Sequence, residues 1–123
     1  TAGADGAPHV IPVCYALDAD GIYVIADAKP KRGPAARLAR LENLRRVPRA
    51  ALVVDDWDED WTRLAWVMVR GSVIFVDDAA AHAAALALLR ARYLQYRAMP
   101  LDDPLQHPVI RLSPERVNLW RAA

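Results

Sequence analysis

Short apolar runs of strand length, separated by turn-forming residues, recur along most of this 123-residue chain. Their β-branched and aromatic residues favour strands. Asp18-Ala19-Asp20-Gly21 predicts a hairpin turn between the first two runs, and Gly71 predicts a bulge or bend between the fourth and fifth. The predicted strands cover residues 10–17, 22–26, 50–54, 64–70, 72–76 and 109–112. This number of short strands in one small chain favours an antiparallel barrel, in the mainly β (α+β) fold class.

Two segments change to the period of a helix. The first follows Pro34, stops before Pro48 and carries three leucines on one face: Leu38, Leu41 and Leu44. The second is rich in alanine, runs over residues 79–96 and has Asp77 or Asp78 as its N-cap. We expect both helices to lie at the rim of the barrel.

The end of the chain has the pattern of a helix start. Ser113 is a capping residue and Pro114 suits the first helical position. We therefore expect a final helical turn that carries Trp120.

Composition indicates one soluble domain over residues 1–123. The chain is 54% hydrophobic with a net charge of +1, and no apolar stretch reaches the length of a membrane span. Cys14 is the single cysteine, so no intrachain disulfide forms and a cytoplasmic location is expected. Residues 1–8 have the pattern of the end of a strand and a turn, which indicates that an N-terminal element is missing.

Lysine is confined to one short segment. The chain has 16 basic residues, but its only lysines are Lys29 and Lys31, next to Arg32 and just before a predicted helix. Ammonium groups and a guanidinium in this position predict a phosphate site, to which the helix start adds favourable dipole. The alternative is a solvated basic turn.

The sequence gives little support for a metal site or for a catalytic serine nucleophile. The histidines, expected at the surface or partly buried, are scattered: His9, His82 and His107. Acidic residues alternate around Asp58 as in a calcium loop, but Trp61 replaces the required glycine and Val67 the final glutamate. We expect a solvated loop over residues 55–61 and no metal site. The serines lack a nucleophile-elbow context.

Nucleic-acid binding is the main non-enzymatic alternative. Residues 29–49 carry eight basic groups against the single acid Glu42. Five acids at residues 55–60 compensate for this charge, and no aromatic residues are interleaved with the arginines. A small phosphorylated ligand is therefore favoured over a nucleic acid.

The order and spacing of several motifs resemble the flavin and deazaflavin split-barrel superfamily. The resemblance is to pyridoxamine 5'-phosphate oxidase-like proteins, particularly the branch thought to use coenzyme F-420. Its motifs are Ala4-Asp5-Gly6-Ala7-Pro8-His9-Val10-Ile11-Pro12-Val13, Asp27-Ala28-Lys29-Pro30-Lys31-Arg32, Leu41-Glu42-Asn43-Leu44, Pro48-Arg49-Ala50-Ala51-Leu52 and Trp66-Val67-Met68-Val69-Arg70-Gly71. Tyr93-Leu94-Gln95-Tyr96-Arg97 and Trp120 extend the likeness over nearly the whole chain.

The resemblance implies a split β-barrel with peripheral helices and a homodimer with a cofactor in a groove at the subunit interface. The implied cofactor is coenzyme F-420, with flavin mononucleotide (FMN) as the alternative. Its ring would lie against residues 10–13 and its phosphate on the Lys29 to Arg32 segment. Trp66 either lines this pocket or belongs to the core. The implied cofactor-binding residues are Val10, Ile11, Pro12, Val13, Ala26, Asp27, Lys29, Lys31, Arg32 and Trp66.

The implied activity is hydride transfer from the reduced deazaflavin to a small organic substrate. No residue is singled out as a proton donor. Two alternatives are an FMN-dependent enzyme of the pyridoxamine 5'-phosphate oxidase type and a non-catalytic binder of a phosphorylated cofactor. Neither a nucleic acid nor a membrane is an expected partner.

Overall fold

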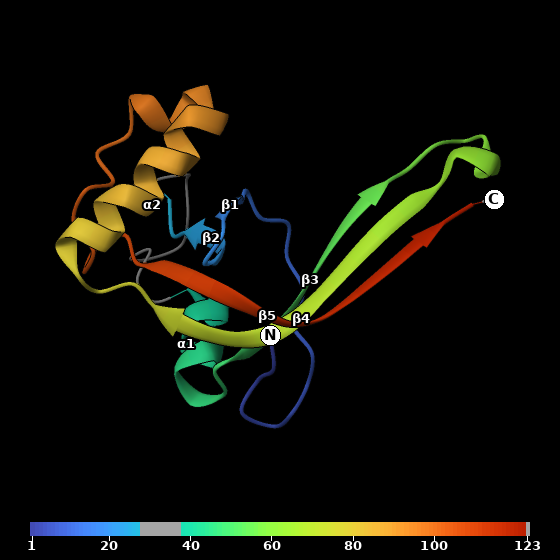
Figure 1. Cartoon of the computed structure of the whole chain (residues 1–123). Coiled ribbons are helices and arrows are strands. Elements are labelled where there is room, and N and C mark those ends of the chain that lie inside the picture. Colours follow the sequence, from blue (N-terminus) through green and yellow to red (C-terminus); the bar gives the residue numbers. More distant parts are fainter. Residues whose placement is uncertain (28–37, 123) are drawn as a thin grey trace.

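A five-stranded antiparallel sheet organises the computed structural model, which describes residues 1–27 and 38–122 (Figure 1). The strand order is β1-β2-β5-β4-β3. The strands are β1 (Ala16–Asp18), β2 (Gly21–Ile25), β3 (Arg49–Asp56), β4 (Ala65–Phe75) and β5 (Val109–Arg121). The helices are α1 (Ala39–Arg46) and α2 (Ala79–Arg92), with 3-10 turns η2 (Trp61–Arg63) and η3 (Leu94–Arg97). The predicted mainly β class with peripheral helices is confirmed.

The sheet has a body and a projecting arm. Figure 1 shows β3, the first part of β4 and the last part of β5 leaving the body as a three-stranded ribbon. We call this ribbon, residues 51–70 and 116–121, the arm. Both helices belong to the body, where β2 separates two cores because its side chains alternate between its faces. Tyr23 and Ile25 pack in the core that includes α2, and Ile22 and Val24 in the core that includes α1.

Gly71 is the site of a bulge, as predicted, but it does not end a strand. β4 runs continuously past it, so the two predicted strands 64–70 and 72–76 are one. The pairing with β5 shifts register between Arg70 and Gly71, where Pro114 lies opposite Gly71. A bulge is one of the few places in a sheet that accepts proline, because the ladder there does not require its missing N–H.

The predicted helical turn at the end of the chain is wrong. β5 continues from Val109 to Arg121 and pairs with β4 from Ile110 to Arg121. Local capping signals at Ser113 and Pro114 are overridden because a neighbouring strand supplies hydrogen-bond partners far away in the sequence.

The first predicted run is a strand only at its end. β1 covers Ala16–Asp18 and forms the predicted hairpin with β2. Residues 9–15 precede it outside any assigned strand.

The helices largely agree with prediction. Asp78 caps α2 by accepting a hydrogen bond from the Ala81 backbone N–H, but α2 ends at Arg92 and η3 follows. The predicted start of the first helix near Pro34 lies outside the described residues. The prediction for His82 is wrong: this histidine is fully buried on the core-facing side of α2, and its Nε2 donates to the His107 carbonyl at 2.9 Å.

Candidate functional site

An apolar groove of about 720 Å³ lies between residues 9–13 and β3. Its volume is within the range of small-molecule sites. The floor is formed by core side chains of the inner sheet face: Ile22, Val24, Val73, Ile110 and Leu112. Arg40, from α1, also contributes to the lining, which includes the amino terminus at Thr1 and the acidic side chain of Asp55. The groove therefore combines an apolar interior with a few charged groups, of which Arg40 is the one cationic side chain in the described lining.

Residues 9–15 are held at both ends. At one end, Thr1 and His9 exchange two backbone hydrogen bonds: the Thr1 amino group donates to His9 O (2.9 Å) and His9 N–H to Thr1 O (2.8 Å). At the other end, the Tyr93 hydroxyl accepts from the Tyr15 N–H (3.1 Å) and donates to the Tyr15 carbonyl (3.0 Å). The guanidinium of Arg92 lies 4.2 Å from the centre of the Tyr15 ring. These contacts position one side of the groove.

Four side chains meet where the chain leaves β2, and we call them the polar junction: Cys14, Asp27, Arg40 and Tyr96. Asp27 is buried, and its carboxylate accepts a hydrogen bond from the Tyr96 hydroxyl at 2.8 Å. Burial raises the pKa of Tyr96, and the hydrogen bond to Asp27 adds to this shift. Burial lowers the pKa of Arg40, whereas the negative charge of Asp27 raises it. Since arginine stays protonated, Arg40 brings a half-buried positive charge to the groove.

Ala26 holds the end of β2 through its backbone. Its carbonyl accepts a hydrogen bond from Nδ1 of His107 at 2.7 Å, and its N–H donates to the Pro108 carbonyl at 2.9 Å. Together with the Asp27–Tyr96 hydrogen bond, these contacts hold the point from which the chain enters residues 28–37.

The substitution Tyr96→Phe is expected to lower the free energy of unfolding by about 2 kcal/mol, because buried Asp27 loses a hydrogen-bond donor. Urea denaturation measures the change. Tyr15→Phe is the matched control, since the Tyr15 side chain interacts with the exposed guanidinium of Arg92 and not with a buried carboxylate, and we expect a change below about 0.5 kcal/mol. Equal effects of the two substitutions would contradict a structural role for the Tyr96 hydroxyl.

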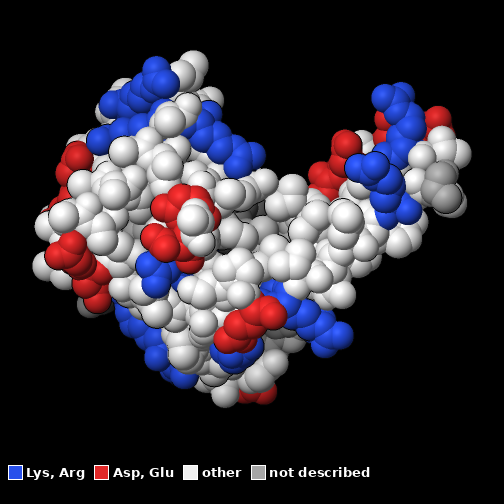
Figure 2. All heavy atoms as spheres, viewed as in Figure 1, with Lys and Arg blue, Asp and Glu red and all other residues white. Residues whose placement is uncertain are grey.

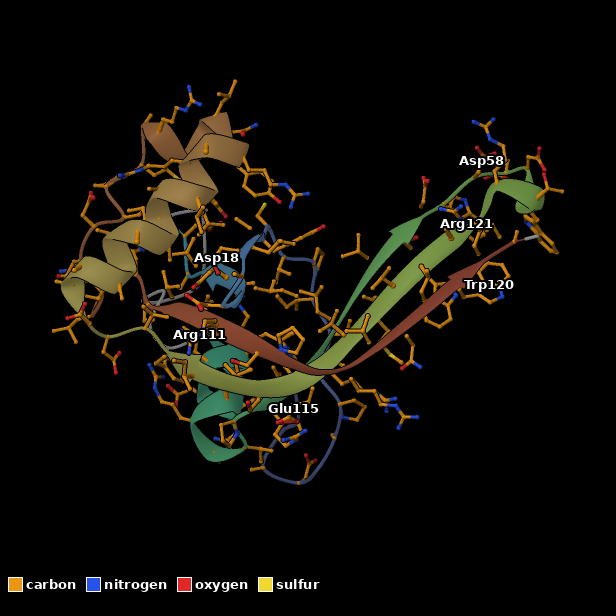
Figure 3. All side chains as sticks on the ribbon, viewed as in Figure 1. Asp18, Asp58, Arg111, Glu115, Trp120 and Arg121 are labelled. Atoms are coloured by element: carbon orange, nitrogen blue, oxygen red, sulfur yellow. The ribbon has the colours of Figure 1, made fainter. Side chains whose placement is uncertain are left out.

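The structure brings together some of the predicted site residues. The groove is lined by four of them: Val10, Ile11, Pro12 and Val13. Asp27 belongs to the polar junction, and Ala26 directly precedes it. Arg40 connects the two sites, because it belongs to the junction and also lines the groove. Trp66 lies on the arm, stacked on Trp120 with ring centroids 6.5 Å apart, and is not among the groove-lining residues. Figure 3 shows Trp120 on the arm, well away from Asp18 and Arg111 in the body. Lys29, Lys31 and Arg32 lie outside the described residues.

Sequence reasoning missed Arg40 and Tyr96 as site residues. Arg40 was one of eight basic residues in the predicted stripe, and only its half-buried position distinguishes it. Tyr96 belongs to a motif of the resemblance, but its contact with Asp27 joins residues 69 positions apart. In residues 1–27 and 38–122, no three histidine, cysteine or acidic side chains form a group suited to a metal ion.

Comparison with known proteins decides the family. A family model described as pyridoxamine 5'-phosphate oxidase matches residues 1–121. The chain belongs to this family. No match is found among curated proteins. Within the described residues, none of the helices has the length and apolar character needed to cross a membrane.

Solved structures agree on the fold of this family member. The protein Rv2991 from Mycobacterium tuberculosis is 23% identical, with a TM-score of 0.78 over 99% of this chain and 74% of that one. HutZ, the heme storage protein from Vibrio cholerae, is 17% identical, with a TM-score of 0.72 over 98% and 81%. A FAD-binding protein from Mesorhizobium loti is 22% identical, with a TM-score of 0.67 over 96% and 80%. The predicted membership of the split-barrel superfamily is confirmed.

Proposed function

We propose that this protein is a homodimeric oxidoreductase that uses the deazaflavin coenzyme F-420 to transfer hydride to a small organic substrate. One observation carries the proposal. Residues 10–13 and the half-buried cation Arg40 line the same groove, and Arg40 is electrostatically coupled to Asp27, immediately before the segment that contains Lys29, Lys31 and Arg32.

The residues present fit such a cofactor. A planar ring requires apolar surface, which residues 10–13 offer, and backbone groups of this segment are available to the polar edge of the ring. A phosphate requires cations, which Arg40, Lys29, Lys31 and Arg32 supply. The bound deazaflavin would itself supply the hydride, so the protein has to bind and orient it.

An FMN-dependent oxidase-type activity is the second candidate. The likeness to a FAD-binding protein favours a flavin-type cofactor without choosing between flavin and deazaflavin. Storage of a cofactor without catalysis is the third, favoured by the likeness to a heme storage protein.

The homodimer is part of the proposal because the arm has apolar side chains on both faces. Alternation along the paired strands puts Val54, Val117 and Leu119 on one face and Val53 and Trp120 on the other. All five side chains are exposed in the single chain. Figure 2 shows that the middle of the arm has little charge in this view. A second copy of the chain would cover this surface.

The double substitution Lys29→Ala with Lys31→Ala is expected to weaken F-420 binding about 100-fold, since two charge-assisted contacts to phosphate are lost. Fluorescence titration measures the affinity. Arg45→Ala with Arg97→Ala removes two exposed charges from the body, away from the arm, and is the matched control, for which we expect unchanged affinity. Full affinity in a folded Lys29/Lys31 variant would remove the phosphate site from the proposal.

A further inference from the structure

One short turn after α2 contacts two segments that lie far apart in the sequence. The turn consists of Tyr93 and η3, and it carries two tyrosines three residues apart, Tyr93 and Tyr96. Side chains at this spacing in a 3-10 helix point to the same side. The two rings accordingly meet edge to face, with centroids 5.6 Å apart and planes at 63°. The tyrosines therefore form one aromatic pair with two hydroxyl groups.

Tyr93 holds the end of the segment that lines the groove. Its hydroxyl makes both hydrogen bonds to the backbone of Tyr15, at 3.1 and 3.0 Å. Tyr15 lines the groove and follows residues 10–13 with only Cys14 between. Tyr93 is not a lining residue, so any effect it has on a ligand in the groove passes through the backbone of Tyr15.

Tyr96 holds the end of β2 instead. Its hydroxyl donates to buried Asp27 at 2.8 Å. A phenol has one hydrogen, so in its hydrogen bond with the Cys14 thiol the Tyr96 oxygen is the acceptor. Tyr96 thus joins the residue after the groove-lining segment to the residue before the segment that contains both lysines. Only 2% of Tyr96 is exposed and it does not line the groove, so it cannot touch a ligand there.

Asp27 interacts with both Tyr96 and Arg40. It accepts the hydrogen bond of the Tyr96 hydroxyl, and its negative charge acts on the guanidinium of Arg40. A buried carboxylate that loses a donor attracts the remaining positive charge more strongly. Removal of the Tyr96 hydroxyl should therefore draw Arg40 toward Asp27 and away from the groove.

Arg90 of α2 fixes the turn that carries the two tyrosines. Its Nε donates to the Tyr96 carbonyl at 3.0 Å and its Nη2 to the Met99 carbonyl at 2.8 Å. The same guanidinium lies 3.3 Å from the carboxylate of Asp102. Cationic side chains near a helix C-terminus commonly bind the last carbonyl groups in this way. One fixed turn therefore sets the positions of residues 15 and 27 together.

We propose that Tyr93 and Tyr96 are positioning residues for the two halves of the cofactor. Tyr93 sets the backbone segment against which the ring lies, and Tyr96 keeps Arg40 available to the phosphate by sharing the charge of Asp27. The proposal rests on the proposed function and adds that each half of the cofactor depends on its own tyrosine. Tyr93→Phe should therefore disturb ring binding, and Tyr96→Phe should disturb phosphate binding.

Two ligands separate the two roles: coenzyme F-420, and the same deazaflavin ring and ribityl chain without the phosphate. Fluorescence titration gives the affinity of each ligand for the wild type, Tyr93→Phe and Tyr96→Phe. Tyr23→Phe is the matched control, because it removes the hydroxyl of another buried tyrosine, one that contacts exposed Asp18 at 3.4 Å. All titrations are made at a temperature at which circular dichroism shows each variant to be folded.

We expect Tyr93→Phe to weaken both ligands equally, by about tenfold, since the ring is common to them. Tyr96→Phe should weaken F-420 by about tenfold and the phosphate-free ligand by less than about twofold. Tyr23→Phe should leave both affinities within about twofold. Without ligand, the amide of Tyr15 should exchange about tenfold faster in Tyr93→Phe and unchanged in Tyr96→Phe. A general loss of stability would not separate the two ligands.

The same losses for both ligands in Tyr96→Phe, or affinities in either variant equal to those of Tyr23→Phe, would overturn the positioning roles. Unchanged exchange of the Tyr15 amide in Tyr93→Phe would do the same. In these cases the wild type still binds F-420, and the proposed function stands. Binding of neither ligand by the wild type would overturn the proposed function and both roles with it.

Discussion

Gly71→Ala is expected to lower the free energy of unfolding by at least about 3 kcal/mol, a large part of the stability of a domain of this size. A Cβ atom at residue 71 would overlap the carbonyl oxygen of Ser113 and lie 2.9 Å from its carbonyl carbon. It would also lie 3.1 Å from the Glu115 nitrogen. All three are backbone atoms, so no side-chain rotation relieves the overlap, and β4 and β5 have to separate at their bulge.

Urea denaturation of purified Gly71→Ala measures this loss. Gly3→Ala is the matched control, because its nearest neighbour would be a flexible carboxylate oxygen of Asp5 at 3.1 Å, and we expect a change below about 1 kcal/mol. A Gly71→Ala variant as stable as Gly3→Ala would show that the two strands do not approach each other as closely as described.

Leu119→Asp is expected to dissociate the proposed homodimer, which is the second large effect. Leu119 is 69% exposed in the single chain, so the substitution should change monomer stability by less than about 0.5 kcal/mol. If the arm is covered by a second copy, an uncompensated charge enters the interface and the dimer dissociation constant rises more than about 100-fold.

Sedimentation across a concentration series checks this expectation. Leu105→Asp makes the same chemical change at a residue that is 80% exposed and lies in the body, and we expect it to leave the dimer intact. A wild-type monomer at all concentrations, or a Leu119→Asp variant that dimerises as tightly as Leu105→Asp, would contradict the arm as the dimer interface.

Local signals in the sequence predict the local parts of the fold. The Asp18 to Gly21 turn and the Asp78 cap each depend on residues a few positions apart, whereas the predicted bulge at Gly71 forms against β5, where Pro114 lies opposite. The local sequence predicted the wrong structure for residues 113–120. Their helix-start signals are overridden by pairing with a strand more than 40 residues earlier. The continuity of β4 through Gly71 has the same cause, because β5 supplies partners on both sides of the bulge.

One lining segment of the candidate site was predictable, although it is not an assigned strand, and the contacts around it were not. Residues 10–13 were predicted as the ring-binding strand from a motif, and they do line a groove. The polar junction could not be predicted from the sequence, because it depends on where η3 and α1 pack against the end of β2. Nothing local distinguishes Arg40 from other arginines of the basic stripe, or marks Tyr96 as the donor to Asp27.

Binding of purified protein to coenzyme F-420 and to FMN, measured side by side by fluorescence titration, tests the central claim most directly. Our account predicts preference for the deazaflavin, with an affinity that falls in the Lys29→Ala, Lys31→Ala variant. Preference for FMN would contradict the deazaflavin assignment in favour of the oxidase-type alternative. Binding of neither would contradict a flavin-type cofactor site at this groove.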